Sequence, residues 1–265
     1  MMTMQRMTTD FPDRASLIVY LQATTGVQDM QVSSIQGGAR SAKQKIAQLD
    51  LEAYRHDRNH LTGHVSGLSP YIRHGLISIS DLVKDLAASY PSDVRARFVQ
   101  QCAWRDYFQR VHQADPCQVW QDRESYKTGF SAQVYADELP LDIQQAQTGV
   151  RIIDQMIQRL LSEGYLHNHA RLYLAAYVVH WRRVKWQAGA KWFLSHLLDG
   201  DIASNNYSWQ WVASTFSAKP YIFNLENVQR FAGDQLDVQH QTNQCFNMSY
   251  ESLSRQLFPN LQTGA

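Results

Sequence analysis

The chain has 265 residues, of which 44% are hydrophobic and 18% are charged, and its formal net charge is +1. This composition excludes a disordered chain, and the near-neutral charge gives no overall basic signal for nucleic acid. No apolar stretch reaches the roughly 20 residues that a membrane span needs, so we expect a cytoplasmic protein without a membrane segment.

The three cysteines, Cys102, Cys117 and Cys245, are odd in number and widely spaced. They match no zinc or iron–sulfur ligand pattern. We therefore expect free thiols in a reducing compartment and no metal site. Residues 1–14 contain no apolar run of the kind that a signal peptide carries.

Apolar residues recur at helical spacing through most of the chain. This spacing predicts helices, in chain order, at residues 14–21, 42–51, 70 onward, 81–89, 94–112, 151–163, 167–185 and 249–258. Ser69 and Pro70 form a typical helix start, and Gly164 is placed to end a strongly amphipathic helix. Residues 113–147 have the weakest periodicity and predict an irregular excursion over the surface.

No run alternates apolar and polar residues for long enough to predict a strand. No internal repeat or low-complexity tract interrupts the helical pattern. The sequence therefore predicts one all-α domain over residues 1–265.

Residues 162–211 are the most unusual stretch, because five of the seven tryptophans lie there among polar residues. The polar residues include His-Asn-His-Ala-Arg at 167–171, Asp-Gly-Asp at 199–201 and two asparagines at 205–206. A simple core would leave such groups unpaired, which is costly. A large planar heteroaromatic cofactor could stack on the rings and form hydrogen bonds with the polar groups. The alternative is that the charged residues form ion pairs that hold two helices together, which would require the same spacing.

Several short motifs follow one another in a particular order. They are Leu-Ser-Pro-Tyr-Ile-Arg-His-Gly at 68–75, Trp-Arg-Asp-Tyr-Phe at 104–108, Thr-Gly at 148–149, Gly-Tyr-Leu-His-Asn at 164–168, Asp-Gly-Asp at 199–201, Asn-Asn-Tyr-Ser-Trp-Gln-Trp at 205–211 and Pro-Tyr-Ile-Phe-Asn at 220–224. In this combination, residues 49–258 resemble the FAD-binding helical domain of the photolyase/cryptochrome family. The resemblance implies the all-α fold of that domain and FAD as its cofactor.

Full-length members of that family carry an α/β antenna domain before the helical domain. The resemblance therefore predicts a stand-alone, short photolyase-like protein, in which residues 1–48 are an N-terminal extension that packs on the helical domain. A separate antenna subunit or another protein partner could then cover the face that the antenna domain occupies in the family.

The resemblance implies FAD contacts from several parts of the chain. The residues that would hold the phosphates and the ribityl chain are Tyr54, Val65, Ser66, Gly67, Leu68 and Ser69. The other implied contacts are Arg105, His167, Asn168, Arg171, Asp199, Gly200, Asp201 and Asn205. The family usually has threonine and arginine where this sequence has Val65 and Gly67.

Within this set the resemblance implies particular roles. Arg171 and Asp199 would form a buried ion pair beside the isoalloxazine, which makes an anionic flavin tolerable in a site of low dielectric. Asp201 would lie along the polar edge of the ring. Asn205 would face the flavin N5, where an amide can donate or accept a hydrogen bond.

Trp209 and Trp186 match two members of the family's electron-transfer path between the flavin and the surface. The third tryptophan has no counterpart, because the region around Gln133 offers only Phe130 and Tyr135. We expect that a tyrosine or Trp181 completes the path, or that the path stops short. Each of these rings could also serve core packing alone.

The resemblance gives mixed indications for DNA as a partner. Trp104 and Trp211 match aromatic residues that line the pyrimidine-dimer pocket, where an extruded base would stack. Gln101, however, stands where repair enzymes have a glutamate, and a glutamine offers no carboxylic proton. His169 replaces an arginine of the DNA-facing surface, so we expect weaker phosphate contacts than in the family.

Three functions follow from these observations. The first is a compact DNA photolyase, a carbon–carbon lyase that uses light-driven electron transfer from the flavin to repair a lesion. The second is a non-enzymatic photoreceptor that signals to a partner through the flavin redox state. The third is a flavin-binding protein without a photochemical role.

Overall fold

The computed structural model describes residues 7–27 and 32–261, and all the regular elements in these ranges are helices. The α-helices are α1 (Arg14–Thr25), α2 (Ala39–Ala47), α3 (Leu51–Asp57), α4 (Ser69–Arg73), α5 (Ile79–Ser89), α6 (Ser92–Ala114), α7 (Leu141–Gln144), α8 (Arg151–Glu163), α9 (Asn168–Ala176), α10 (Trp186–His196), α11 (Ile202–Ala213), α12 (Leu225–Ala232) and α13 (Tyr250–Leu257). Within the same residues the β-structure is limited to an isolated bridge between Ala136 and Val184. The predicted all-α fold is confirmed.

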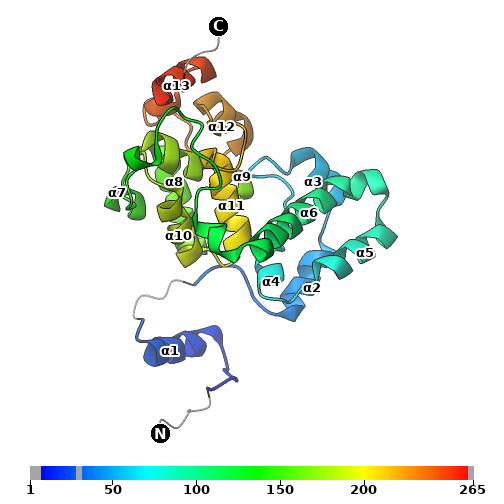
Figure 1. Ribbon diagram of the computed structural model, residues 1–265. Helices are drawn as coiled ribbons and strands as arrows, with labels where there is room; N and C mark the ends of the chain where they lie inside the picture. The colour runs from blue at the N-terminus through cyan, green and yellow to red at the C-terminus, as the bar shows by residue number, and fades with distance from the viewer. Residues whose placement is uncertain (1–6, 28–31, 262–265) are drawn as a thin grey trace.

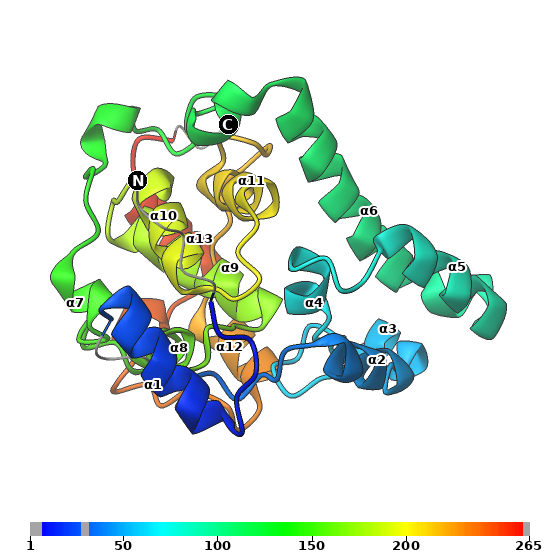
Figure 2. The same ribbon diagram turned by 90° about the horizontal axis from the view of Figure 1, so that it is seen from below.

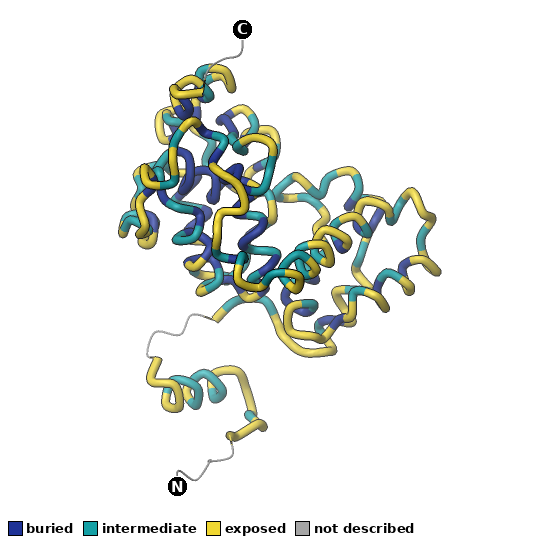
Figure 3. The backbone as a smooth tube through the Cα atoms, viewed as in Figure 1, coloured by how far each residue is buried: buried dark blue, intermediate teal, exposed yellow. Residues whose placement is uncertain are grey.

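Two main hydrophobic cores lie side by side, and α6 and α11 run where they meet (Figure 1). A third, small cluster of Val119, Ala203 and Tyr207 packs between these two helices. The smaller core joins α2 to α6 and includes Leu51, Tyr54 and Phe98. The larger core joins α8, α9, α10, α11 and α12, and most of the buried residues in Figure 3 belong to it. The seam, by which we mean the region between the two main cores, holds a cavity that is lined by Phe98 and Cys102 of the smaller core and by Phe193 and Trp209 of the larger core.

Helix α8 shows how the sequence pattern produces the larger core. Ile152, Ile153, Met156, Ile157 and Leu160 are all buried and lie on one face of the helix. Gly164 ends the helix in the left-handed conformation, at φ 62°, where glycine carries no Cβ penalty. Both bounds agree with the prediction.

Other helix bounds differ from the prediction for local reasons. The predicted helix at 42–51 is two helices, because the Asp50 carboxylate accepts a hydrogen bond from the Ala53 amide and starts α3. Helix α4 starts at Ser69 rather than Pro70, and Leu68 is its N-cap. Helix α12 was not predicted, although the Asn224 side chain caps it by accepting from the Asn227 amide.

The predicted helix at 167–185 ends early. Helix α9 is followed by a π-helical turn, Tyr177–Trp181, and the chain then leaves helical geometry. Arg183 has φ of 50°, and its carbonyl accepts the Ala136 amide at the isolated bridge. This bridge to a distant segment stops the helix, and a local pattern does not reveal it.

Helix α1 has no buried residue and stands apart from the other helices in Figure 1, whereas the view from below in Figure 2 shows it in front of α8 and α12. The chain is anchored to the helical body further on, where Ser34 Oγ donates to Glu163 at 2.6 Å and Tyr71 donates to the Gln36 carbonyl at 2.6 Å. That residues 1–265 form one domain stays a prediction. Within the described ranges, no helix is long and apolar enough to cross a membrane.

Candidate functional site

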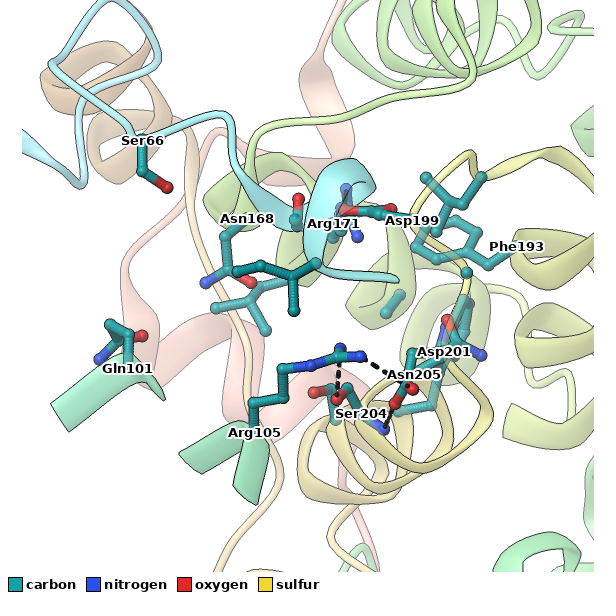
Figure 4. Close-up of a pocket in the computed structure, with 18 of the residues that line it drawn as sticks. Ser66, Gln101, Arg105, Asn168, Arg171, Phe193, Asp199, Asp201, Ser204 and Asn205 are labelled. Atoms are coloured by element: carbon teal, nitrogen blue, oxygen red, sulfur yellow. Dashed lines mark hydrogen bonds and ion pairs between the residues drawn. The ribbon is translucent and has the colours of Figure 1, made fainter. Parts of the chain in front are cut away.

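A cavity of about 250 Å³ lies at the seam between the two cores, and a second one of about 380 Å³ adjoins it. Their walls share several residues, among them Ser66, Asn168, Arg171 and Asp199. Figure 4 shows labelled side chains from α6, α9, α10 and α11 around one space. Segments far apart in the chain therefore build one continuous candidate site.

Helix α6 forms one wall of the cavity. Phe98, Gln101, Cys102 and Arg105 line it, and they recur every three or four residues along one face of the helix. Burial raises the pKa of the Cys102 thiol to about 11, so this cysteine stays protonated and is no nucleophile at neutral pH. The wall supplies one apolar ring, one amide and one cation to the space.

Asp199 and Arg171 form the predicted ion pair, with Arg171 Nη2 2.8 Å from Asp199 Oδ2. Arg171 is held in place because its Nε also donates to the Leu166 carbonyl at 2.9 Å. The other carboxylate oxygen, Asp199 Oδ1, is buried and has no partner among the described residues. A buried carboxylate oxygen without a donor is costly, so this atom indicates a missing hydrogen-bond donor.

His167 presents a second such atom to the adjoining cavity. Its Nδ1 accepts the His169 amide at 3.1 Å, so the neutral ring carries its proton on Nε2. Nε2 is buried without a well-formed hydrogen bond in the described part of the chain. Burial, followed by the nearby His169 and Arg171, lowers the pKa of His167 to about 4, and the Arg58 backbone offsets only part of this lowering. At neutral pH His167 is therefore an uncharged donor toward a ligand.

Asp201 is satisfied by protein groups instead. Its Oδ1 accepts the Ser204 amide at 2.8 Å as the N-cap of α11, and Gln109 and Arg105 donate to it from α6 at 2.7 and 3.2 Å. Figure 4 shows Arg105 reaching both Asp201 and Ser204. Burial alone would raise the pKa of Asp201, but these hydrogen bonds and the Arg105 charge outweigh it and lower the pKa. Asp201 thus joins α6 to α11 beside the cavity.

Asn205 and Trp209 lie one turn apart on α11, and both line the cavity. The Asn205 amide nitrogen donates to the Ala190 carbonyl at 3.1 Å, which leaves the amide oxygen as the group available to a ligand. Trp209 is 2% exposed, and its Nε1 is buried without a partner in the ranges described. This side of the cavity therefore offers an acceptor, a donor and an aromatic ring.

Most of the predicted phosphate-side residues line the adjoining cavity. Tyr54, Ser66 and Ser69 line both cavities, and Val65 and Gly67 line the adjoining one. Leu68 differs, because it is fully buried in the smaller core and does not line either cavity. Leu68 can contribute to the site only through its backbone.

The predicted lesion-side residues are separated. Gln101 lines both cavities, but Trp104 and Trp211 do not line either of them and are 50% and 43% exposed. Trp104 packs against Tyr107 and Phe108, and Trp211 packs against Tyr221. The two indoles are surface rings outside the cavity.

Several residues of the site were not predicted from the sequence. Gln109 lies one helical turn after Arg105 on α6, so the spacing of four residues could have indicated it. Phe193 and Ser204 line the cavity on α10 and α11, and Arg58 lines the adjoining one. These three carry no distinctive local pattern. No group of three or more potential metal ligands occurs in the residues that the structure describes.

The site fits a planar, nitrogen-rich cofactor. Its walls combine apolar rings with the unpartnered Asp199 acceptor and the unpartnered His167 and Trp209 donors. Arginine side chains from α6 and α9 supply positive charge toward an anionic group. These features match the flavin, ribityl and phosphate parts of FAD in chemical type.

Comparisons with known proteins agree with an FAD site. A family model described as the FAD binding domain of DNA photolyase matches residues 98–241. A deoxyribodipyrimidine photo-lyase of Streptomyces griseus is 30% identical over 193 residues, which cover 71% of this chain and 42% of that protein. One of Alkalihalophilus pseudofirmus is 33% identical over 184 residues, which cover 66% of this chain and 37% of that protein.

Solved structures show the same fold. A bacterial class III photolyase from Agrobacterium tumefaciens has a TM-score of 0.63 at 25% identity, over 84% of this chain and 45% of that one. A cryptochrome from Synechocystis has a TM-score of 0.66 at 21% identity, over 86% of this chain and 47% of that one.

The fold and the cavity define a helical FAD-binding domain. The chain belongs to the photolyase/cryptochrome family, and its cofactor is FAD. It spans less than half the length of the curated relatives that it matches here.

Proposed function

We propose that light drives electron transfer from Trp186 through Trp209 to FAD bound in the cavity. The observation that supports this proposal best is the position of Trp209. Its indole lines the cavity, yet it is 2% exposed and packs against α10, the helix that begins with Trp186. Trp209 is thus the residue through which a charge could pass from the cavity into the protein.

Bound FAD would supply absorption of blue light and exchange of single electrons. We propose that Asp199 Oδ1, the Asn205 oxygen and His167 Nε2 hold the polar edge of the ring system. Ser66, Ser69 and Tyr54 would contact the phosphate side. Other residues of the cavity walls, Val65, Gly67, Asn168 and Gly200 among them, would shape the space around it.

The electrostatics of the walls support this proposal. Arg171 and Arg105 each lie within 3.2 Å of a carboxylate, so their charges are paired but still close to the cavity. Positive charge in a partly desolvated site stabilises added negative charge on a ligand. With each arginine paired to a carboxylate, the walls would therefore tolerate added negative charge on the ring system.

The test is photoreduction of the purified, FAD-loaded protein under blue light with a soluble thiol as the final reductant. Trp209 would donate an electron to the light-excited cofactor and would be reduced again from Trp186. We expect Trp209→Phe to slow the bleaching of the flavin absorption about tenfold or more. Equal rates in the two proteins would remove Trp209 from the path, and a protein that takes up no FAD would refute the assignment of the site.

The relatives named deoxyribodipyrimidine photo-lyase make DNA repair the first candidate activity. Gln101 lies on the cavity wall, where it could hydrogen-bond an extruded base. The exposed rings of Trp104 and Trp211 could stack on neighbouring bases. The experiment is repair of cyclobutane-dimer DNA under blue light, with the Gln101→Glu variant beside the wild type, and we expect the variant to repair faster.

A non-enzymatic photoreceptor is the second candidate. It is favoured by Gln101, which offers no carboxylic proton, and by the placement of Trp104 and Trp211 outside the cavity. Repair by neither protein, together with normal photoreduction, would support this candidate. FAD binding without photoreduction would support the third function, a flavin-binding protein without a photochemical role.

A further inference from the structure

The proposed function does not identify the residue at the surface end of the electron path, because Trp186 is fully buried. An electron that leaves Trp186 must be replaced from outside, so some ring or backbone group has to connect it to solvent. The sequence predicts that a tyrosine or Trp181 completes the path, or that the path stops short. The rings that contact Trp186 decide between these residues.

Trp181 faces a different part of the larger core. Its ring centroid lies 5.0 Å from that of Phe246 and 5.2 Å from that of Phe223, and its Nε1 donates to the Cys245 carbonyl. These neighbours place Trp181 on the side of α12 and the C-terminal segment. Trp181 is therefore poorly placed to receive charge from Trp186.

The tyrosine candidates are buried. Tyr135 stacks on Tyr126 with ring centroids 4.3 Å apart, and the Tyr126 hydroxyl lies beside the Trp186 backbone. A phenol releases its proton when it is oxidised, and burial together with the Asp122 charge raises the pKa of Tyr126 strongly. The described residues also provide no hydrogen-bond acceptor for the Tyr126 hydroxyl. The missing acceptor opposes oxidation at Tyr126, because the proton that the phenol must lose has no group to go to.

Trp120 is the ring that extends the path. It stacks on Trp186 with centroids 6.3 Å apart and planes only 2° from parallel. Trp186 is fully buried and Trp120 is partly exposed, so the pair leads from the core to the surface. Trp120 ends the 3₁₀ turn Pro116–Trp120, in the segment that the sequence analysis predicted to be an irregular excursion.

Asp122 sits where it would stabilise positive charge on this pair. Its Oδ1 accepts the Trp186 Nε1 proton at 2.6 Å and the Gln187 side-chain amide at 3.1 Å. The Gln187 amide also reaches the Trp120 carbonyl at 3.4 Å, which ties the two segments together. A carboxylate that accepts an indole N–H favours the oxidised, positively charged indole.

Lys191 brings a positive charge close to the pair, with Nζ 5.7 Å from the Trp120 ring centroid. The Lys191 charge repels the positive charge that oxidation would place on Trp120. Trp120, being partly exposed, can relieve that charge by releasing its indole proton to water once it has given up its electron.

We infer that Trp120 is the outermost electron donor of this chain, and that Asp122 is a positioning residue that orients Trp186 against it. This inference rests on the proposed function. The electron passes from Trp120 to oxidised Trp186, the indole proton of Trp120 goes to water, and a soluble thiol then returns one electron and one proton to Trp120. The thiol is the net reductant.

The test compares photoreduction of the FAD-loaded wild type with four variants under the same blue light and thiol. We expect Trp120→Phe to slow it about tenfold, Trp120→Tyr to slow it less, and Trp181→Phe and Tyr126→Phe to leave it within about twofold. A wild-type rate in Trp120→Phe, or a tenfold loss in Tyr126→Phe or Trp181→Phe alone, overturns the inference.

Two further readouts separate this inference from the proposed function. If Trp209→Phe is slow while Trp120→Phe is as fast as the wild type, the proposed function stands and the inference fails. In the protein without FAD, Trp120→Phe and Asp122→Asn should each shift the Trp186 indole N–H resonance, through loss of the ring current and of the carboxylate acceptor. An unchanged resonance in both variants would contradict the geometry itself.

Discussion

Gly189 leaves the space that the Trp209 ring occupies. A Cβ atom built at Gly189 would lie 2.2 Å from Trp209 Cη2 and 2.4 Å from Cζ3, both atoms of a rigid ring. Since Trp186 and Gly189 are three residues apart on α10, they share one face of that helix. The absent side chain is therefore what lets the ring that lines the cavity approach the helix that carries Trp186.

Gly189→Ala is expected to displace Trp209. Alanine gains up to about 1 kcal/mol in a helix, whereas overpacking a core costs about 1–3 kcal/mol, so the net change should lower the free energy of unfolding. We expect slower photoreduction as well, because the ring moves. Gly37→Ala is a control for adding a methyl group without a clash, since its Cβ would meet nothing within 4 Å and the residue lies outside the helices. Urea unfolding and flavin bleaching measure the two effects, and a more stable Gly189→Ala protein would contradict the packing argument.

The unpartnered oxygen of Asp199 gives a prediction about FAD affinity. Asp199→Asn removes the charge that pairs with Arg171 and keeps the size of the side chain. We expect the dissociation constant for FAD to rise about tenfold or more, which is about 1.4 kcal/mol. Asp142→Asn is the control, because its ion pair with Arg182 lies away from the cavity and is more exposed. Titration of the two proteins with FAD distinguishes them, and equal affinities would show that Oδ1 has no ligand role.

Asp201 should contribute both to stability and to the shape of the site. Asp201→Ala removes the N-cap of α11 and the contacts to Arg105 and Gln109, so we expect a loss of about 1–3 kcal/mol and weaker FAD binding. Ser249→Ala, which removes the N-cap of α13 far from the cavity, should lose stability without losing FAD affinity. Identical FAD affinity in Asp201→Ala and the wild type would make Asp201 purely structural.

The lowered pKa of Asp201 also predicts a pH effect. The folded state binds this proton less tightly than the unfolded state, so the contribution to stability is complete above the ordinary pKa of 3.8. It is lost as the pH falls from there through the lower, folded pKa. Asp201→Asn should therefore flatten the loss of stability in this acidic range, and acid unfolding followed by circular dichroism measures it. A variant with the same slope as the wild type would contradict the pKa direction.

The local sequence pattern was sufficient to predict the bounds of a helix that buries a single apolar face. Helix α8 was predicted to the residue because its apolar positions and Gly164 are adjacent in sequence. The end of the helix before Arg182 depends on pairing with Ala136, and the existence of the cavity depends on two cores that meet. Neither relationship can be seen in a short stretch of sequence, so neither could be predicted from the residues alone.

The candidate site shows the same division. Residues within motifs, such as Asp199 and His167, were predicted because the family resemblance named their positions. Trp120 was overlooked because it lies in the non-periodic segment, and its significance arises only when the fold stacks it on Trp186. Leu68 was assigned to the site by its place in a motif, although its side chain belongs to the smaller core.

His180 predicts a loss of stability at mildly acidic pH. Its Nε2 donates to the Val212 carbonyl at 2.9 Å, so a second proton would have to sit on Nδ1, which is buried with no partner in the described chain. Burial lowers the pKa of His180 from 6.5 to about 4, and the hydrogen bond to Val212 only partly opposes this. Between these values the unfolded state binds more protons than the folded state, so stability falls as the pH falls.

The measurement is the free energy of unfolding of the FAD-free protein from pH 7 to pH 4. One histidine contributes a slope of at most about 1.4 kcal/mol per pH unit in this range. His180→Gln keeps a donor for the Val212 carbonyl but does not titrate, so its curve should be flatter by up to that amount. Because His167 titrates in the same direction, some slope should remain in the variant. Superimposable curves for the two proteins would mean that His180 is already charged, or accessible to water, in the folded state.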